Sequence, residues 1–192
     1  MTESAGFHNK ISKKAINLAK TGDITAVELI YNTFSTACYS LALRICGDQS
    51  TAEDVVHEAF IKVFKKIDSY SEKGSFGGWL KQIVTNESIN RIKQNSRLLL
   101  VSDIEQSSNE SSSLFDQNWL EANLDLDKLI RQLSCTARVV LILHEVEGYT
   151  HKEIANLFDK SESFSKVALS RAYTELKKLV TTTNKEQNNA LK

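Results

Sequence analysis

The chain has 192 residues, of which 41% are hydrophobic and 25% are charged, and its formal net charge is zero. These values are ordinary for a globular protein with one domain or two small ones. No apolar run approaches the ~18 residues that a membrane span needs, and the N-terminal segment lacks the apolar stretch of a secretory signal. We therefore expect no membrane insertion and a cytoplasmic location.

Cysteine and proline usage narrows the fold class. The three cysteines include no C-x-x-C pair, so the sequence predicts neither a disulfide framework nor a zinc site. Proline is absent, and the apolar periods that can be recognised are helical. We predict an all-α protein without a metal or another cofactor.

The zero net charge conceals an uneven distribution along the chain. Residues 98–127 contain seven acidic and no basic residues, and the Ser-rich run QSSNESSS interrupts the helical pattern there. This composition is typical of a flexible linker. We divide the chain into a basic N-terminal segment (1–22), a helical domain (23–97), an acidic linker (98–126), a second helical domain (127–180) and a C-terminal tail (181–192).

The first distinctive element is a predicted helix over residues 52–64, AEDVVHEAFIKVF. Its apolar residues recur at helical spacing and form a buried stripe. They are Ala52, Val55, Val56, Ala59, Phe60, Val63 and Phe64. The opposite face carries Asp54, His57, Glu58 and Ile61. Like charges four residues apart cost a helix roughly 0.2–0.5 kcal/mol, so a solvated face alone explains this arrangement poorly.

A second predicted helix covers residues 79–97. Its apolar face, formed by Leu80, Ile83 and Val84, fades toward the C-terminal end. One stripe instead carries Trp79, Asn86, Asn90, Lys93 and Arg97. Aromatic rings stack on unpaired bases, amides pair with base edges and cations neutralise phosphate. The stripe therefore indicates nucleic-acid binding, while a solvated helix end, with Trp79 in the core, stays open as an alternative.

The second domain contains two predicted helices joined by the turn DKSE. Thr150 and Glu153 form a capping box at the start of a helix over residues 151–158, and a second helix covers residues 163–180. Such a pair is typical of a helix-turn-helix, whose second helix enters the major groove. Its outward face carries Phe164, Lys166, Val167, Ser170, Arg171, Thr174 and Lys178. Because the positive charge of this face is modest, a plain αα-hairpin stays open.

Three stretches in this order resemble a known family. They are GDQSTAEDVVHEAFIKVFKKIDSY, FGGWLKQIVTNESINRIKQ and LSCTARVVLILHEVEGYTHKEIANLF. Together they resemble a bacterial RNA polymerase sigma factor of the extracytoplasmic-function group in the sigma-70 family. The resemblance covers about residues 24–97 and 127–180, and it implies a region 2 helical bundle and a region 4 helix-turn-helix.

The resemblance also implies partners and site residues. The face with Asp54, His57, Glu58 and Ile61 corresponds to the one that docks on the basic clamp coiled coil of core RNA polymerase. The helix that carries Asn86 corresponds to the one that holds the melted promoter element. The second helix of the helix-turn-helix corresponds to the one that contacts the upstream promoter element. An anti-sigma factor is a further partner that the family implies.

The chain departs from the family pattern at several positions. His57 replaces a common Gln, and Asp159 replaces the usual Gly of the turn, although Asp tolerates a left-handed backbone. In the recognition helix, Phe164, Ala168 and Tyr173 stand where a Thr and two Arg are common. Phosphate contacts should therefore be fewer, and the upstream sequence or its affinity should differ.

Other functions receive less support from the sequence. His57-Glu58 and His144-Glu145 begin like a zinc-protease helix but lack the second His, and no Gly-rich phosphate loop follows a strand, so we expect no catalytic site and no enzyme. A polymerase-binding adaptor or anti-sigma-like interaction protein is the main alternative. An ordinary helix-turn-helix regulator would leave the first domain without a purpose. For the acidic linker, a solubilising tether and an electrostatic mimic of RNA in the polymerase both stay open.

Overall fold

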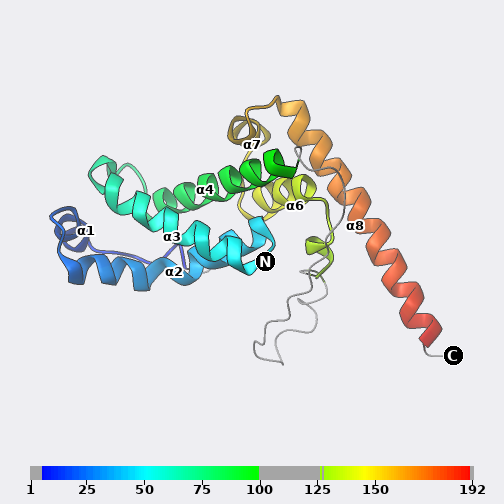
Figure 1. Ribbon diagram of the computed structural model, residues 1–192, viewed down its shortest axis with the longest axis horizontal. Helices are drawn as coiled ribbons and strands as arrows, with labels where there is room; N and C mark the ends of the chain where they lie inside the picture. Colours follow the sequence, from blue (N-terminus) through cyan, green and yellow to red (C-terminus); the bar gives the residue numbers. More distant parts are fainter. Residues whose placement is uncertain (1–5, 100–125, 127, 191–192) are drawn as a thin grey trace. The chain divides into compact units, whose positions relative to one another are not determined.

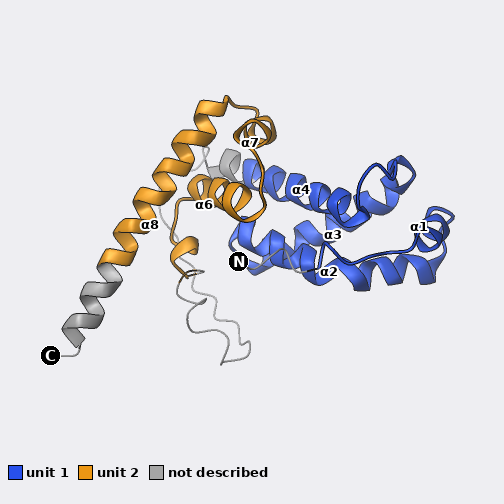
Figure 2. Cartoon of the chain, turned by 180° about the vertical axis from the view of Figure 1, so that it is seen from behind, with its two compact units in different colours: residues 1–105 blue, residues 106–192 orange. Residues whose placement is uncertain are grey.

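The computed structural model describes residues 6–99, 126 and 128–190, with the backbone alone for residues 95–99 and 182–190. All regular structure among these residues is helical, and the chain divides into two compact units, Met1–Glu105 and Gln106–Lys192 (Figure 2). The prediction of an all-α protein with two helical domains is therefore confirmed. Most of the acidic linker lies outside the described residues.

Unit 1 is a bundle in which three long helices pack against one another (Figure 1). These helices are α2 (Ile24–Cys46), α3 (Gln49–Lys66) and α4 (Phe76–Leu99). The short α1 (Lys13–Lys20) packs on α2, and the 3-10 turn η1 (Ile67–Ser69) follows α3. The exposed parts of α2, α3 and α4 are therefore the surfaces that unit 1 offers to partners.

Side-chain caps explain where the helices of unit 1 begin. Ser12, Asp23 and Asp48 precede α1, α2 and α3, and each side chain accepts a hydrogen bond from the backbone N–H three residues further on. These bonds satisfy donors that a helix start otherwise leaves unpaired. Gly47 ends α2 with a φ of 88°, a left-handed conformation that glycine adopts without strain.

The core of unit 1 lies between α2, α3 and α4. Its fully buried side chains include Ile30, Phe34, Leu41, Ile45, Val55, Val63, Leu80, Val84 and Ile89. The predicted apolar stripe of residues 52–64 is buried at six of its seven positions, and only Phe64 is half-buried. Cys38 is also fully buried, and burial raises the pKa of its thiol to about 12.

The N-terminal segment contributes to the same core. Phe7 is 4% exposed, and the Asn9 amide donates to the Thr33 carbonyl of α2 at 3.2 Å. The Phe7 backbone runs so close to the start of α4 that a Cβ atom at Gly77 would overlap the Phe7 carbonyl oxygen. This approach therefore requires glycine at position 77.

Unit 2 packs two short helices against one long helix. The helix α6 (Cys135–Leu141) continues into the π-helical turn η2 (Ile142–Val146), and α7 (His151–Phe158) is followed by α8 (Glu162–Ala190). Both α6 and α7 contact α8, around buried Val139, Leu143 and Ile154. The helix α8 passes the predicted end at Val180 because the segment TTTNKEQNNA contains neither glycine nor proline.

Candidate functional site

The outward face of α3 presents charged and polar groups to solvent. Asp54, His57 and Glu58 are exposed, and Ile61 is half-buried. The Asp54 carboxylate lies 3.7 Å from the Arg91 guanidinium of α4, and its side chain is 60% exposed. An ion pair this long and this exposed contributes little, so the carboxylate stays accessible to a partner.

A groove separates this face from α2. It has a volume of about 590 Å³ and is lined by Tyr31, Ser35, Thr36, Tyr39, Glu53, Asp54, Val56 and His57. Tyr31 packs on the Phe60 ring with the ring centroids 4.8 Å apart. Two carboxylates beside two phenol rings suit a cationic side chain with an apolar stem. The α2 side of this groove was not predicted, because it forms only when α2 packs beside α3.

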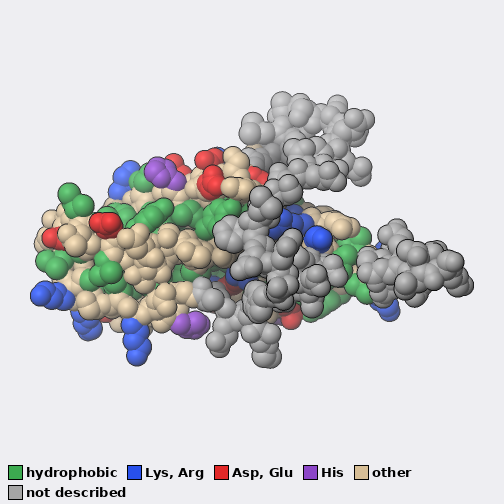
Figure 3. Space-filling view, turned by 90° about the horizontal axis from the view of Figure 1, so that it is seen from below, with side chains coloured by type: hydrophobic (Ala, Val, Ile, Leu, Met, Phe, Trp, Pro, Cys, Tyr) green, Lys and Arg blue, Asp and Glu red, His purple; other side chains and the backbone are tan. Residues whose placement is uncertain are grey.

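The surface of unit 1 has no uniform sign. In the face shown in Figure 3, basic and acidic side chains are scattered over the visible part of the unit. This mixture matches the nine basic and nine acidic residues of the predicted first domain. The charge of the surface of unit 1 therefore varies from place to place, and the α3 face is one local group of acidic side chains.

The helix α4 is continuous, so its predicted stripe lies along one helix. Asn86 and Lys93 are half-buried, Asn90 is exposed, and the Arg97 side chain lies outside the described side chains. Trp79 is half-buried, and its ring centroid lies 5.4 Å from those of both Tyr70 and Phe76. These contacts give Trp79 a structural role in the aromatic cluster at the start of the helix.

The prediction that the apolar face of α4 fades after Val84 is wrong. Ile89 is 1% exposed, and Thr85 and Ser88 are fully buried with it. The Ser88 hydroxyl donates to the Val84 carbonyl at 2.9 Å, which removes the cost of burying an unpaired hydroxyl. The polar residue types at these positions concealed the buried stripe.

An ion pair fixes α3 against the middle of α4. The Lys62 ammonium lies 2.5 Å from the Glu87 carboxylate, whose side chain is 14% exposed. Glu87 directly follows Asn86, so the pair positions the candidate DNA-binding stripe relative to α3. The residues are 25 apart in the sequence, and no local pattern predicts their contact.

The helix-turn-helix of unit 2 has the predicted start and turn. The Thr150 N–H donates to the Glu153 carboxylate at 2.8 Å, and the Glu153 N–H donates to the Thr150 hydroxyl at 3.2 Å, which confirms the capping box. The Thr150 N–H and the Thr150 hydroxyl both donate to the Glu153 carboxylate, and these two hydrogen bonds lower the pKa of Glu153. Asp159 ends α7 with a φ of 54°, so the aspartate adopts the left-handed conformation that a glycine usually provides.

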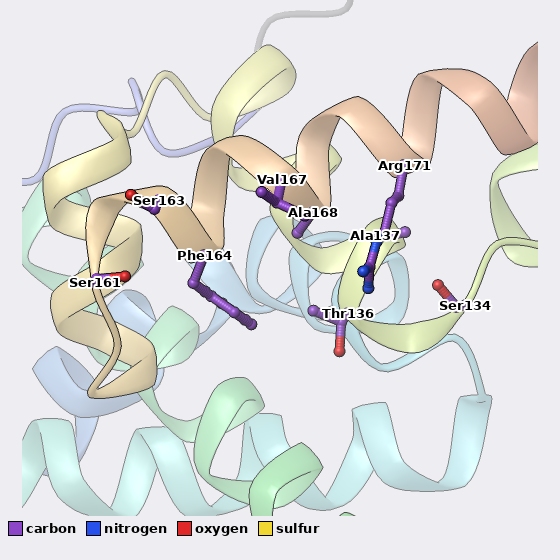
Figure 4. Close-up of a pocket in the computed structure, with 9 residues that line it drawn as sticks. All are labelled: Ser134, Thr136, Ala137, Ser161, Ser163, Phe164, Val167, Ala168 and Arg171. Carbon is purple, nitrogen blue, oxygen red and sulfur yellow. The ribbon is translucent and has the colours of Figure 1, made fainter.

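The outward face of α8 borders a groove beside the start of α6. Lys166, Val167, Ser170 and Arg171 are exposed, while Phe164 is half-buried with its ring centroid 5.4 Å from that of Phe158. The groove has a volume of about 380 Å³ (Figure 4). It is lined by Ser134, Thr136, Ala137, Ser161, Ser163, Phe164, Val167, Ala168 and Arg171. The α6 residues of this groove were not predicted.

Two histidines stack behind the recognition helix. The rings of His144 and His151 are 4.3 Å apart and nearly parallel, at 15°. The His151 Nδ1 atom lies 3.0 Å from the buried Ser165 hydroxyl of α8. Partial burial, and then the nearby His144 and Lys166, lower the pKa of His151. Ring stacking and this hydrogen bond therefore connect η2, α7 and α8 through His151.

Family comparisons agree with this two-unit architecture. The model of sigma-70 region 2 matches residues 30–98, and the model of sigma-70 region 4 matches residues 123–176. The two matches together cover more than half of the chain. The first falls on the α2 to α4 bundle and the second includes the helix-turn-helix.

Two sigma factors align with most of this chain. The chain is 28% identical over 178 residues to the ECF RNA polymerase sigma factor SigW of Bacillus subtilis, covering 86% of this chain and 95% of that protein. It is 30% identical over 142 residues to the ECF RNA polymerase sigma factor SigE of Mycolicibacterium smegmatis, covering 70% of this chain and 54% of that protein.

Solved structures support the fold. The sigma factor RpoE of Bartonella quintana, in complex with the anti-sigma factor NepR, aligns with a TM-score of 0.56 at 21% identity, over 82% of this chain and 98% of that chain. CnrH in complex with the cytosolic domain of CnrY aligns with a TM-score of 0.50 at 18% identity, over 88% and 96%.

A region 2 bundle followed by a region 4 helix-turn-helix defines a transcription initiation factor of the sigma type. The chain belongs to the extracytoplasmic-function group of the sigma-70 family. It binds core RNA polymerase and directs promoter-specific transcription initiation, and it is not itself an enzyme. The match to region 2 accounts for unit 1. The alternative of an ordinary helix-turn-helix regulator explains unit 2 alone. Among the described residues, no helix is long and apolar enough to cross a membrane.

Proposed function

We propose that the α3 face is the principal docking surface for the clamp coiled coil of core RNA polymerase. The observation that supports this most directly is the pair of exposed carboxylates, Asp54 and Glu58, one helical turn apart. His57 lies between them, and Ile61 supplies an apolar contact beside them. A basic partner helix neutralises the repulsion between the two carboxylates, and the neighbouring α2–α3 groove receives its side chains.

The α4 stripe is the proposed binding surface for the melted promoter element. Asn86 and Asn90 supply amides for base edges, and Lys93 and Arg97 supply charge for the phosphates. Trp79 lies at the start of the stripe. The exposed part of its half-buried ring is the proposed surface on which a base stacks. The Lys62–Glu87 ion pair keeps this stripe in register with the docking face on α3.

The recognition helix α8 is the proposed contact with the upstream promoter element. Lys166 and Arg171 are exposed cations on its outward face, and Ser170 adds an exposed hydroxyl beside them. Phe164 and Val167 form an apolar part of the same face. This mixture supports duplex binding with few phosphate contacts.

The proposed partners also place the protein in the cell and suggest how it is regulated. Core polymerase and promoter DNA occupy the cytoplasm, so the chain acts there. Two structural neighbours were solved with an anti-sigma factor or with the cytosolic domain of another protein. By analogy, an anti-sigma factor is the proposed inhibitor, and it occupies surfaces that core polymerase also needs.

The docking surface is tested by reversing its charge. In an Asp54→Lys, Glu58→Lys double variant, lysines meet a basic partner, and we expect affinity for core polymerase to fall at least a hundredfold, equivalent to several kcal/mol. Competition for core polymerase against a labelled sigma factor measures this. The control variant Glu28→Lys, Asp68→Lys has the same net charge at exposed positions outside the groove and should retain binding. Equal losses in both variants would contradict the proposed docking site.

A further inference from the structure

We infer that Val167 selects a thymine in the upstream promoter element by contact with its methyl group, next to a guanine bound by Arg171. This inference rests on the proposed contact between α8 and upstream DNA. It assigns a base preference to a side chain that departs from the polar and cationic character expected of a recognition helix.

The geometry places three groups in one row along α8. Phe164, Val167 and Arg171 are spaced by three and four residues, so they lie on one helix face, and all three line the groove beside α6 (Figure 4). Val167 is 50% exposed. The Phe164 ring packs against Phe158 of α7. This contact fixes an apolar side chain one helical turn before Val167.

The chemistry of the major groove distinguishes the four bases at such a surface. Thymine presents a methyl group, whereas cytosine and adenine present amino donors. Val167 and Phe164 offer no acceptor, so an amino group buried against them loses its hydrogen bond to water. A methyl group buried there gains hydrophobic stabilisation. The apolar pair therefore favours thymine over cytosine and adenine.

Arg171 fixes where this thymine lies. An arginine that donates two hydrogen bonds to guanine is the commonest specific contact in the major groove. Val167 and Arg171 are four residues apart, which is about 6 Å along the helix, and successive base pairs are about 3.4 Å apart. The thymine and the guanine should therefore lie within about two base pairs of each other.

The charges around the groove favour DNA over a partner protein. Its lining includes Arg171 and no acidic residue, and hydroxyl groups from Thr136, Ser161 and Ser163 surround the apolar part, while the Ser134 hydroxyl donates to the Glu175 carboxylate. Hydroxyl groups and cations contact phosphate oxygens in protein–DNA complexes. An apolar centre with a positive, hydroxyl-rich border therefore fits the edge of a duplex.

The test uses the full chain assembled with core polymerase and a duplex library randomised in the upstream element. The sequences that bind should be enriched in a thymine near a guanine. Replacing that thymine by deoxyuridine removes only the methyl group. Affinity should then fall about fourfold, which corresponds to the ~0.8 kcal/mol of one buried methyl group. In the Val167→Ser variant, the same replacement should change affinity by less than about 1.5-fold, since the methyl loses its contact with the exposed valine, and Phe164 lies one helical turn away.

A matched control and a reference variant separate the possible outcomes. Val180 is a second exposed valine of α8 that does not line the groove, and Val180→Ser should retain the fourfold effect of the methyl group. The inference is wrong if deoxyuridine has no effect on the unaltered protein, or if Val167→Ser keeps the effect. If no sequence is enriched and Arg171→Ala also leaves duplex binding unchanged, the proposed DNA contact of α8 fails as well.

Discussion

At the scale of single residues, the stacked histidines behind α8 give unit 2 a sensitivity to acid. The two rings lie face to face at 4.3 Å, so a positive charge on His144 disfavours a proton on His151. Partial burial, His144 and Lys166 all lower the pKa of His151, while Glu162 and Glu145 act in the opposite direction. The folded unit therefore favours neutral His151.

The sign of the resulting pH dependence follows from this lowered pKa. Unfolded His151 titrates near the ordinary value of about 6.5, so the unfolded chain binds a proton at a higher pH than the folded chain does. The free energy of unfolding is fully retained above that value and falls as the pH drops below it. We expect His151→Gln to flatten this fall in unit 2, as measured by denaturation at pH 5 to 7.5 and followed by the NMR signals of α7 and α8. A measured His151 pKa above 6.5 would contradict this expectation.

At the scale of the helices, elements with a local signature were predictable. The capping box Thr150–Glu153 and the stripe of α3 each lie within a few turns of one helix, where sequence spacing determines geometry. The position of the charged α3 face follows from the same spacing. The pairs Lys62–Glu87 and Asp54–Arg91 join different helices, so they depend on packing that the sequence pattern does not contain. Both grooves were missed for this reason.

The start of α4 depends on a glycine that the N-terminal segment requires. Gly77→Ala should destabilise unit 1 by about 1–3 kcal/mol, because the new methyl group overlaps the Phe7 backbone and forces the segment away. Gly78→Ala is the matched control, since its Cβ would meet only the Ser75 hydroxyl at 3.0 Å, and alanine favours the helix by up to ~1 kcal/mol.

Chemical denaturation measures both glycine variants. The fluorescence of Trp79 reports on unit 1 directly, and a Trp119→Phe background removes the second tryptophan of the chain. Equal stability of the two variants would show that the N-terminal segment does not press on α4 in solution.

At the scale of the whole molecule, the proposed function assigns the melted promoter element to unit 1 and the upstream element to unit 2. Asn86→Ala should slow open-complex formation while core binding is retained, because the side chain belongs to the proposed melted-strand surface on α4.

Arg171→Ala should weaken binding of the upstream duplex and reduce its dependence on salt. Permanganate reactivity of the melted region and filter binding at several salt concentrations distinguish the two defects. If Arg171→Ala has no effect on any promoter, unit 2 is better described as a protein-binding helical hairpin.

The alkylation rate of the buried Cys38 thiol measures how often unit 1 opens. With a pKa of about 12, only roughly one Cys38 in ten thousand is a thiolate at pH 8, and the thiolate is the form that alkylating reagents attack. Alkylation of Cys38 therefore has to wait until the α2–α3–α4 bundle opens. Core polymerase stabilises the folded form that it binds, so docking should lengthen this waiting time. The rate of alkylation at Cys38 should therefore fall as the holoenzyme assembles, and this residue is already present in the chain.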